Sequence, residues 1–408
     1  HESAEDDVVG ETAVTQITLA NDTITVEGDG VMINGHIATI TAAGTYNLSG
    51  TLSEGQIVVD TQDAETVHLI FDGINISNSV TAPIYVANAE ETVIMLAENS
   101  DNVVTDGANY LFPDAETDEP NAAVFSYDNL TIYGTGSLTV QANYNDGIAS
   151  KDGLIITSGN ITINAVDDGI RGKDYLVIKD GTFNITAQGD GLKSDEDEDA
   201  SKGYIAIEGG NIAITSGGDA IQAQTNVLIA GGTFNLTTGG GSNAALAADL
   251  SAKGIKGSVN VVIDGGSFTI NTADDAVHSN GSMIINGGNF TIASGDDGMH
   301  ADASLEINDG TIDIQTSYEG LEANDVIING GTVDIISSDD GINGAGGNDS
   351  SSINVNNGGR RDNFTGSQST IIINGGTITI AAAGSGNGDG LDANGTITIS
   401  GGDMVIKE

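Results

Sequence analysis

The residues best suited to chemistry in this 408-residue chain are acids that return at one place in a repeated motif. A single acid or a pair of acids stands directly before a Gly or Ala and then an apolar residue, as in the tetrapeptide from Asp167 to Ile170. Carboxylates stacked at the strand spacing of about 4.8 Å repel one another unless protons or cations neutralise them. Carboxylate oxygens at a glycine corner are ligands suited to Ca²⁺. We therefore expect calcium sites among the corner acids, which are Asp146, Asp167, Asp168, Asp190, Asp219, Asp274, Asp275, Asp296, Asp297, Glu319, Asp339, Asp340 and Asp389.

The same acids allow a simpler interpretation. Asp is favoured at turns because its carboxylate accepts hydrogen bonds from the turn backbone, so solvated corner residues would give the same pattern without a metal. The chain has neither an EF-hand loop nor the glycine-rich nonapeptide of calcium-binding β-helices. We favour calcium because paired acids recur in one phase of the repeat, and solvated corners remain the alternative.

Basic residues gather just after three successive acidic corners, at Lys151, Arg171, Lys173 and Lys193. Calcium beside a base is the arrangement that a polysaccharide lyase needs. The metal neutralises a uronate carboxylate while the base removes the proton α to it. The alternative, which we favour, is that these basic side chains offset the repulsion among the stacked corner acids.

Two histidines, His278 and His300, are separated by 22 residues and each follows a corner acid by three positions. This spacing predicts that their rings stack. We expect them to be exposed corner residues, with a metal-binding role as the alternative. The sequence has no Trp, so the candidates for exposed aromatic contacts with sugar are Tyr144, Tyr175, Tyr204 and Tyr318.

The repeat that carries these residues has a recurring interval of 22 residues, for example between Gly169 and Gly191 and between Ala276 and Gly298. Each repeat holds three short apolar pieces that alternate with polar residues, which predicts three strands with one buried face. A helix-free repeat of this length predicts an all-β parallel β-helix with about 22 residues per coil. Phenylalanine recurs at one position of the third strand, which predicts an internal aromatic stack of Phe183, Phe234, Phe268 and Phe290.

The repeat also sets the expected domain organisation. Residues 1–15 form an acidic tail, and residues 16–408 form a single β-helix domain, irregular over 16–145 and regular over 146–408. Insertions are expected near 194–201, 239–252 and 343–369, the second with a possible short helix at 244–250. Glycines before the third strand are expected at corners with positive φ.

The composition narrows the set of partners. The formal net charge of −48 excludes nucleic acid and anionic membranes as partners and favours cations and glycans. The chain has no cysteine, and it lacks the apolar run of about 18 residues that a membrane-spanning helix needs.

Several N-terminal segments resemble the clostridial carbohydrate-binding β-helix family: Ile40–Leu52, Gly55–Asp60, Phe71–Ile76 and Ala82–Val86. The acidic corners resemble this family too. The resemblance implies a right-handed parallel β-helix similar in fold to pectate lyases, and a secreted or cell-surface location. It also implies binding to cellulose-like or pectin-like polysaccharide, by members regarded as binders rather than lyases. Calcium is implied at the matching corner acids Asp167, Asp168, Asp190, Asp274, Asp275, Asp296, Asp297, Asp339 and Asp340.

Three functions follow from these observations. The first is a non-catalytic, calcium-stabilised polysaccharide-binding protein. The second is a self-assembling surface protein or filament, whose subunits are bridged by calcium or exchange a strand, because an exposed final coil can template another chain. The third is a calcium-dependent polysaccharide lyase.

Overall fold

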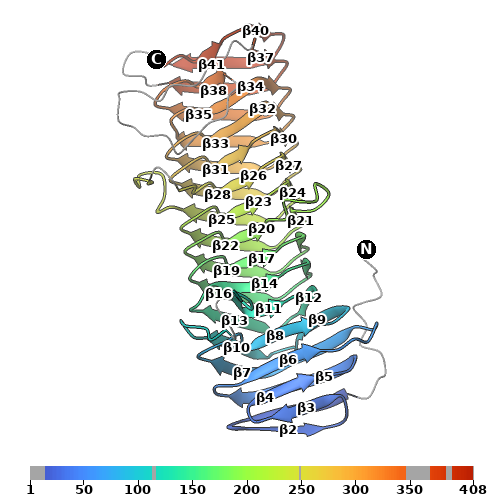
Figure 1. Cartoon of the computed structure of the whole chain (residues 1–408). Helices are drawn as coiled ribbons and strands as arrows, with labels where there is room; N and C mark the ends of the chain where they lie inside the picture. The colour runs from blue at the N-terminus through green and yellow to red at the C-terminus, as the bar shows by residue number, and fades with distance from the viewer. Residues whose placement is uncertain (1–13, 113–115, 248–249, 346–367, 383–387, 408) are drawn as a thin grey trace. The chain divides into compact units, whose positions relative to one another are not determined.

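A computed structural model describes residues 14–112, 116–247, 250–345, 368–382 and 388–407. All of the regular secondary structure in these residues is β-strand, so the protein is all-β. The described residues contain no helix that could cross a membrane. The chain divides into two compact units, His1–Ile185 and Thr186–Glu408. Figure 1 labels strands of both units.

The strands of the first unit are β1 Val14–Asn21, β2 Thr23–Glu27, β3 Val31–Asn34, β4 Ile37–Ile40, β5 Gly44–Leu52, β6 Gln56–Asp60, β7 Val67–Asn78, β8 Ile84–Asn88, β9 Glu91–Leu96, β10 Asp101–Asp106, β11 Ala122–Ser126, β12 Asn129–Gly134, β13 Ser137–Ala142, β14 Asp146–Ser150, β15 Gly153–Ile156, β16 Asn160–Ala165, β17 Ile170–Gly172 and β18 Tyr175–Ile178. Strand β19, Thr182–Ala187, contains the boundary between the units.

The strands of the second unit are β20 Leu192–Ser194, β21 Tyr204–Ile207, β22 Asn211–Ser216, β23 Ile221–Ala223, β24 Asn226–Ile229, β25 Thr233–Thr238, β26 Ile255–Gly257, β27 Asn260–Ile263, β28 Ser267–Thr272, β29 Val277–Ser279, β30 Ser282–Ile285, β31 Asn289–Ser294, β32 Met299–Ile307, β33 Thr311–Thr316, β34 Leu321–Ile328, β35 Thr332–Ser337, β36 Ile342–Gly344, β37 Thr370–Ile373, β38 Thr377–Ala382, β39 Leu391–Ala393, β40 Thr396–Ile399 and β41 Asp403–Lys407.

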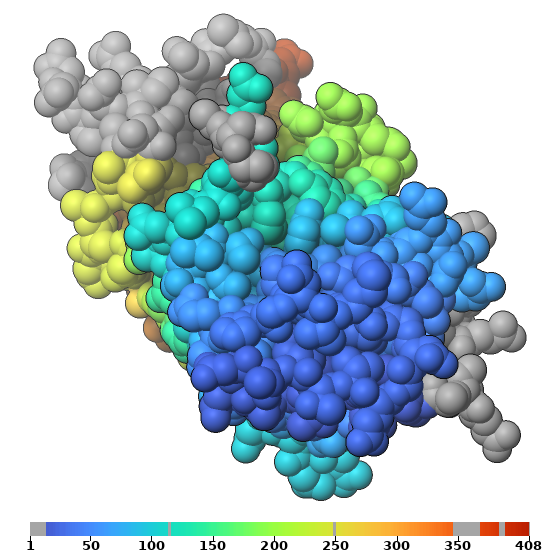
Figure 2. All heavy atoms as spheres, turned by 60° about the horizontal axis from the view of Figure 1, so that its bottom comes forward, coloured from blue at the N-terminus to red at the C-terminus, as the bar shows by residue number. Residues whose placement is uncertain are grey.

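The first unit begins with two antiparallel pairs, β1 with β2 and β3 with β4. These pairs differ from the parallel coils expected from residue 17 onward. From β5 the pairing is parallel, and from β10 to β16 each strand pairs with the third strand after it, as in β10 with β13 and β11 with β14. Figure 2 looks onto the first strands, whose atoms form a closed surface on the face in view.

The second unit is regular. Strands β20, β23, β26 and β29 pair in parallel in one file, and β22, β25, β28, β31, β33, β35, β38 and β41 pair in another. The partners Val277 and Met299 are 22 residues apart, as are Ser267 and Asn289. This register gives the unit the solenoid-like, mostly parallel fold that the repeat predicts.

The core is built by the inward-facing residues of each strand. The rings of Phe234 and Phe268 stack 4.6 Å apart, and those of Phe268 and Phe290 stack 4.5 Å apart. The predicted aromatic stack is thus confirmed for three phenylalanines, and Phe183 is buried in the first unit. At the corner before β28, Gly266 has a φ of +119°, and a Cβ there would lie 3.0 Å from the ring of Phe268, so the predicted glycine corner is also confirmed.

The predicted tail and insertions are described only in part. Residues 1–13 of the expected tail lie outside the described residues, and Val14 and Thr15 belong to β1. Most of the third insertion, 346–367, and residues 248–249 of the second also lie outside them. The described residues of 244–250 form bends and irregular chain, so the short helix considered there is absent from them.

Candidate functional site

The corner acids lie mostly inside the protein. Asp167 and Asp389 are exposed, Asp190 and Asp339 are half-buried, and the others are buried: Asp146, Asp168, Asp219, Asp274, Asp275, Asp296, Asp297, Glu319 and Asp340. Buried carboxylates need hydrogen bonds and counter-cations, because an isolated charge in a low-dielectric interior is costly. The interpretation of these residues as simply solvated is therefore wrong for most of them.

Backbone N–H groups satisfy one oxygen of many corner acids. The N–H of a corner residue donates to the carboxylate of the corner before it, so each acid fixes the turn of its neighbour. The bonds join Asp219 N to Asp190 Oδ1 (2.8 Å), Asp297 N to Asp275 Oδ1 (3.0 Å), Glu319 N to Asp297 Oδ1 (3.0 Å) and Asp389 N to Asp340 Oδ1 (2.6 Å). The second oxygen of each acid is left to meet a cation or another donor.

The first cluster of acids, in the first unit, consists of Asp146, Asp167 and Asp168, whose ligand atoms all lie within 4.8 Å of one another. Asp146 Oδ1 accepts the backbone N–H of Asp168 at 3.2 Å. Asp146 Oδ2 is buried without a hydrogen-bond partner, and Arg171 Nη1 lies 3.8 Å from it. Burial and the neighbouring Asp168 charge raise the pKa of Asp146 to about 8. The cluster thus brings three carboxylates together and offers oxygen ligands alone.

The second cluster consists of Asp274, Asp275 and Asp296, again within 4.8 Å of one another. It already holds a cation of its own. Lys253 Nζ donates to Asp274 Oδ1 at 2.9 Å and to Asp275 Oδ2 at 2.6 Å, and the Lys253 side chain is 3% exposed. Burial alone would lower the pKa of Lys253, but the charges of Asp275 and Asp274 raise it above its usual value. Lys253 therefore remains protonated between the two acids.

Sequence reasoning missed Lys253. It stands directly before Gly254, in the position that the neighbouring repeats fill with an acid, so the repeat alone marks it as a corner residue. Its backbone N–H donates to Asp219 Oδ1 at 2.7 Å, as a corner acid would. A search by position in the repeat, rather than by acidic type, would have found it.

The third cluster consists of Asp297, His300 and Glu322, with ligand atoms within 4.8 Å of one another. His300 Nδ1 lies 3.0 Å from Glu322 Oε2 and 3.3 Å from Asp297 Oδ2, and its Nε2 lies 3.2 Å from Asp302 Oδ1. Burial would lower the pKa of His300, yet the three carboxylates raise it well above its usual value. Burial raises the pKa of Glu322 to about 8. Glu322 and Asp302 were not among the predicted site residues, although Glu322 follows His300 by one repeat.

The two histidines stack as predicted, with ring centroids 5.0 Å apart and an interplanar angle of 12°. The expectation that they are exposed was wrong, because the side chains of His278 and His300 are 4% and 1% exposed. Corner carboxylates make this burial possible, since His278 Nδ1 pairs with Asp275 Oδ2 at 2.9 Å.

Other corner acids in the described residues lie outside the three clusters and meet side chains of other types. Lys193 Nζ lies 3.0 Å from Asp190 Oδ2, and Lys256 Nζ lies 3.4 Å from Asp219 Oδ2. The remaining pairs are Asn343 Nδ2 with both oxygens of Glu319 (2.9 and 2.8 Å) and the Tyr318 hydroxyl with Asp339 Oδ2 (2.7 Å). Burial raises the pKa of Asp340 to about 6.

Three of the four basic residues considered for lyase chemistry lie beside acids. Arg171 lies near Asp146 and Lys193 contacts Asp190, as charge compensation predicts. Lys151 instead forms an ion pair with Glu119, a residue outside the repeat. Lys173 is half-buried on the strand connection after β17.

The tyrosines proposed for sugar contact are half-buried rather than fully exposed. The ring of Tyr144 stacks on that of Tyr110 at 4.2 Å. The hydroxyl of Tyr318 is directed at Asp339. An exposed aromatic platform for sugar rings is thus absent at Tyr144, Tyr175, Tyr204 and Tyr318.

Comparison with known proteins places the chain in a family. The family described as "Carbohydrate-binding domain-containing protein" matches residues 34–298 and 298–408. A protein of Acetivibrio thermocellus with the same description is 43% identical over 151 residues, which are 37% of this chain and 53% of that protein, so the match spans about half of the relative's length. A solved structure, the gadolinium derivative of a polysaccharide lyase-like protein from C. thermocellum, is 40% identical. It matches with a TM-score of 0.55 over 56% of this chain and 92% of that one. This chain belongs to the family of carbohydrate-binding domain-containing proteins.

Proposed function

We propose that the chain is a non-catalytic polysaccharide-binding protein that acts outside the cell on cellulose-like or pectin-like chains. The family match over residues 34–408 is the observation that carries this proposal. We further propose that the fold is a single right-handed parallel β-helix domain with about 22 residues per coil. The parallel pairing across 22 residues supports the coil size, and the handedness follows the general preference of parallel crossover connections.

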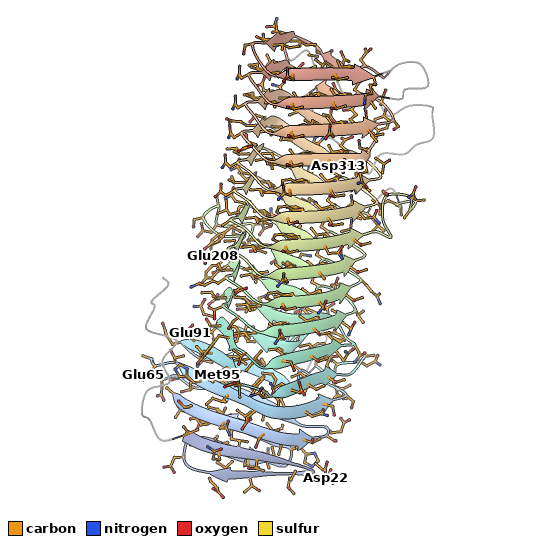
Figure 3. All side chains as sticks on the ribbon, turned by 180° about the vertical axis from the view of Figure 1, so that it is seen from behind. Asp22, Glu65, Glu91, Met95, Glu208 and Asp313 are labelled. Carbon is orange, nitrogen blue, oxygen red and sulfur yellow. The ribbon has the colours of Figure 1, made fainter. Side chains whose placement is uncertain are left out.

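One outward sheet surface of the second unit offers regular polar contacts for such a chain. We call it the hydroxyl face, and it lies on β25, β28, β31, β33, β35 and β38 (Figure 3, where Asp313 marks it). Paired strands bring its side chains into two rows with a spacing of about 4.8 Å. The rows are Thr233, Ser267, Asn289, Thr311, Thr332 and Thr377, and Asn235, Thr269, Thr291, Asp313, Asp334 and Thr379.

These rows could hydrogen-bond the hydroxyl groups of an extended polysaccharide without an aromatic platform. Hydroxyls, amides and carboxylates supply both donors and acceptors, which suits a neutral glycan. A uronate-containing glycan would in addition need cations between its carboxylates and the acids of the face.

Replacing Thr269 and Thr291 with valine tests this face. We expect affinity for the bound insoluble polysaccharide to fall about tenfold, because two hydrogen bonds of about 0.5–1.5 kcal/mol each are lost. The measurement is depletion of protein from solution by cellulose and by calcium pectate. The matched control replaces Thr396 and Thr398 of β40, which are exposed on another strand file. Equal losses in both double variants, or none in the first, would contradict the assignment.

We propose calcium as the stabilising ion of the first cluster. Asp146, Asp167 and Asp168 supply oxygen ligands alone, and the buried Asp146 Oδ2 has no hydrogen-bond partner, so the residues fit a hard cation. The two charges of the ion, together with the charge of Arg171 beside Asp146, would offset the three carboxylates. The second cluster fits less well, because Lys253 already lies between Asp274 and Asp275. The gadolinium derivative of the solved neighbour is in keeping with affinity for hard cations. Unchanged glycan binding and melting in EGTA at matched ionic strength would contradict calcium.

Association of the chain with its own copies is the second candidate function. Residues Ile397, Ile399 and Ile406 are in the inward phase of β40 and β41, yet they are 43%, 55% and 44% exposed. Their partners one repeat earlier, Ile371, Ile373 and Ile380, are buried. A strand of a second copy that pairs with this edge would cover them.

Replacing Ile397 and Ile399 with lysine is expected to reduce particle size in light scattering to that of single chains, because charge on a covered edge opposes strand addition. Thr398→Lys is the control, since Thr398 faces outward on the same strand. Particles of unchanged size in the double variant would contradict association through this edge.

A further inference from the structure

The stacked histidines have different neighbours, although they occupy the same position in successive repeats. His278 pairs with Asp275, and the ammonium group of Lys253 lies 2.6 Å from that same carboxylate. His300 faces Asp297 and Glu322 with one ring nitrogen and Asp302 with the other. The lysine gives the first histidine's corner a fixed positive charge. The second corner concentrates three carboxylates around one imidazole.

We propose that Asp297, His300 and Glu322 form a binding site for a divalent transition-metal ion, with Zn²⁺ as its best-matched occupant. The site is separate from the calcium site proposed at Asp146 and rests on different donor chemistry. Calcium prefers oxygen ligands alone, whereas zinc is bound by imidazole nitrogen together with carboxylate oxygen.

The distances between the donor atoms fit this ion. Three ligands that bind one tetrahedral zinc at about 2.0–2.1 Å lie about 3.4 Å apart from one another. His300 Nδ1 lies 3.0 Å from Glu322 Oε2 and 3.3 Å from Asp297 Oδ2. A small movement of these side chains would therefore admit the ion. Three protein ligands leave the fourth position for water.

Asp302 supplies a second, independent indication. A metal-bound histidine generally donates its other ring N–H to a carboxylate, which fixes the tautomer and directs the free lone pair at the metal. Asp302 Oδ1 lies 3.2 Å from His300 Nε2, while Nδ1 faces Asp297 and Glu322. The Asp302 side chain is 22% exposed, so the carboxylate beside His300 Nε2 is partly open to solvent.

The sheet holds the ligands in place. His300 and Glu322 are direct partners in the parallel pairing of β32 with β34, and Asp297 lies at the corner just before β32. The carboxylate Oδ1 of Asp297 is fixed by the backbone N–H of Glu319 at 3.0 Å, which leaves Oδ2 for the ion. Ligands on paired strands are positioned more rigidly than ligands on loops. The side chains of His300 and Asp297 are 1% and 4% exposed.

The test is zinc binding to the full chain after metal removal, measured by calorimetry and by metal analysis of gel-filtered protein. We expect the unchanged protein to bind one zinc ion that excess calcium does not displace. Glu322→Gln, which keeps the side-chain shape, is expected to weaken binding at least about a hundredfold, and Asp302→Asn about 10–100-fold. His278→Asn is the matched control, with affinity within about threefold of the unchanged protein.

Melting and circular dichroism confirm that each variant is folded before it is compared. If His300→Asn does not fold, Glu322→Gln and Asp302→Asn still decide the question, because both leave the imidazole stack intact. Equal affinity in Glu322→Gln and the unchanged protein would overturn the proposal, since Glu322 would then not be a zinc ligand. Equal loss in His278→Asn and Glu322→Gln, or displacement of zinc by calcium, would overturn it too.

Discussion

Replacing Lys253 with methionine is expected to lower the free energy of unfolding by about 3–5 kcal/mol. The substitution removes the ammonium group that contacts Asp274 and Asp275, which are 1% and 0% exposed. Methionine fills a similar volume, so the loss reports the two buried carboxylates left without a counter-charge. The measurement is equilibrium unfolding in urea at neutral pH.

Lys256→Met provides the control for this prediction. Lys256 Nζ lies 3.4 Å from Asp219, its side chain is 23% exposed, and Asp219 keeps its hydrogen bonds from Ser251 and from the backbone of Lys253 when this lysine is replaced. We expect the control to cost about 0–1 kcal/mol. The double variant Lys253→Met with Asp275→Asn should recover part of the lost stability, because one uncompensated charge is gone. Similar losses for the two lysines would show that the buried position of Lys253 has no special electrostatic role.

Replacing Asp146 with asparagine is expected to change stability in opposite directions with and without calcium. In calcium at about a thousand times the dissociation constant, the bound ion contributes about 4 kcal/mol, most of which the variant should lose. In EGTA the variant should be more stable than the unchanged protein, because it lacks a buried carboxylate whose Oδ2 has no hydrogen-bond partner. Thermal melting in both buffers measures the effect.

The pH dependence in EGTA follows from the raised pKa of Asp146, about 8 compared with an ordinary 3.8. The folded state holds this proton more tightly than the unfolded state. The stabilisation that comes from this tighter proton binding is fully present below pH 3.8 and is lost as the pH rises toward 8. Asp146→Asn should remove this loss, so its advantage in EGTA should grow across that interval. Asp313→Asn, at a half-buried position of β33, is the control, with no calcium dependence expected. A stabilising or destabilising shift of the same sign in both buffers would contradict the calcium site.

The fold was predictable because its determinants repeat along the sequence. The interval of 22 residues places Phe268 and Phe290 in one phase, and the structure stacks them for that reason. The antiparallel pairing of β1–β4 has no such signal, since these strands lie outside the regular array. Terminal repeats are often irregular, but the sequence does not say which pairing they adopt.

The candidate site was predictable only in part. Asp146 and Asp297 were identified because they are acids at the corner position of the repeat. The burial of these acids depends on residues of other types in the neighbouring repeats. Lys253 occupies an acid's position, and Glu322 occupies a histidine's, so a search by residue type passed over both. The buried His300 meets Asp297 and Asp302, which are its neighbours in the sequence, and Glu322, which only the pairing of β32 with β34 brings beside it.

Each of the three acid clusters is expected to hold a different cation. The most direct test is a crystal structure grown with calcium and zinc, with anomalous difference maps measured on both sides of the zinc absorption edge. We predict a zinc peak between Asp297, His300 and Glu322, a calcium ion at Asp146, Asp167 and Asp168, and the ammonium group of Lys253 alone between Asp274 and Asp275. One kind of ion at all three clusters, or an ion that displaces Lys253, would contradict the claim.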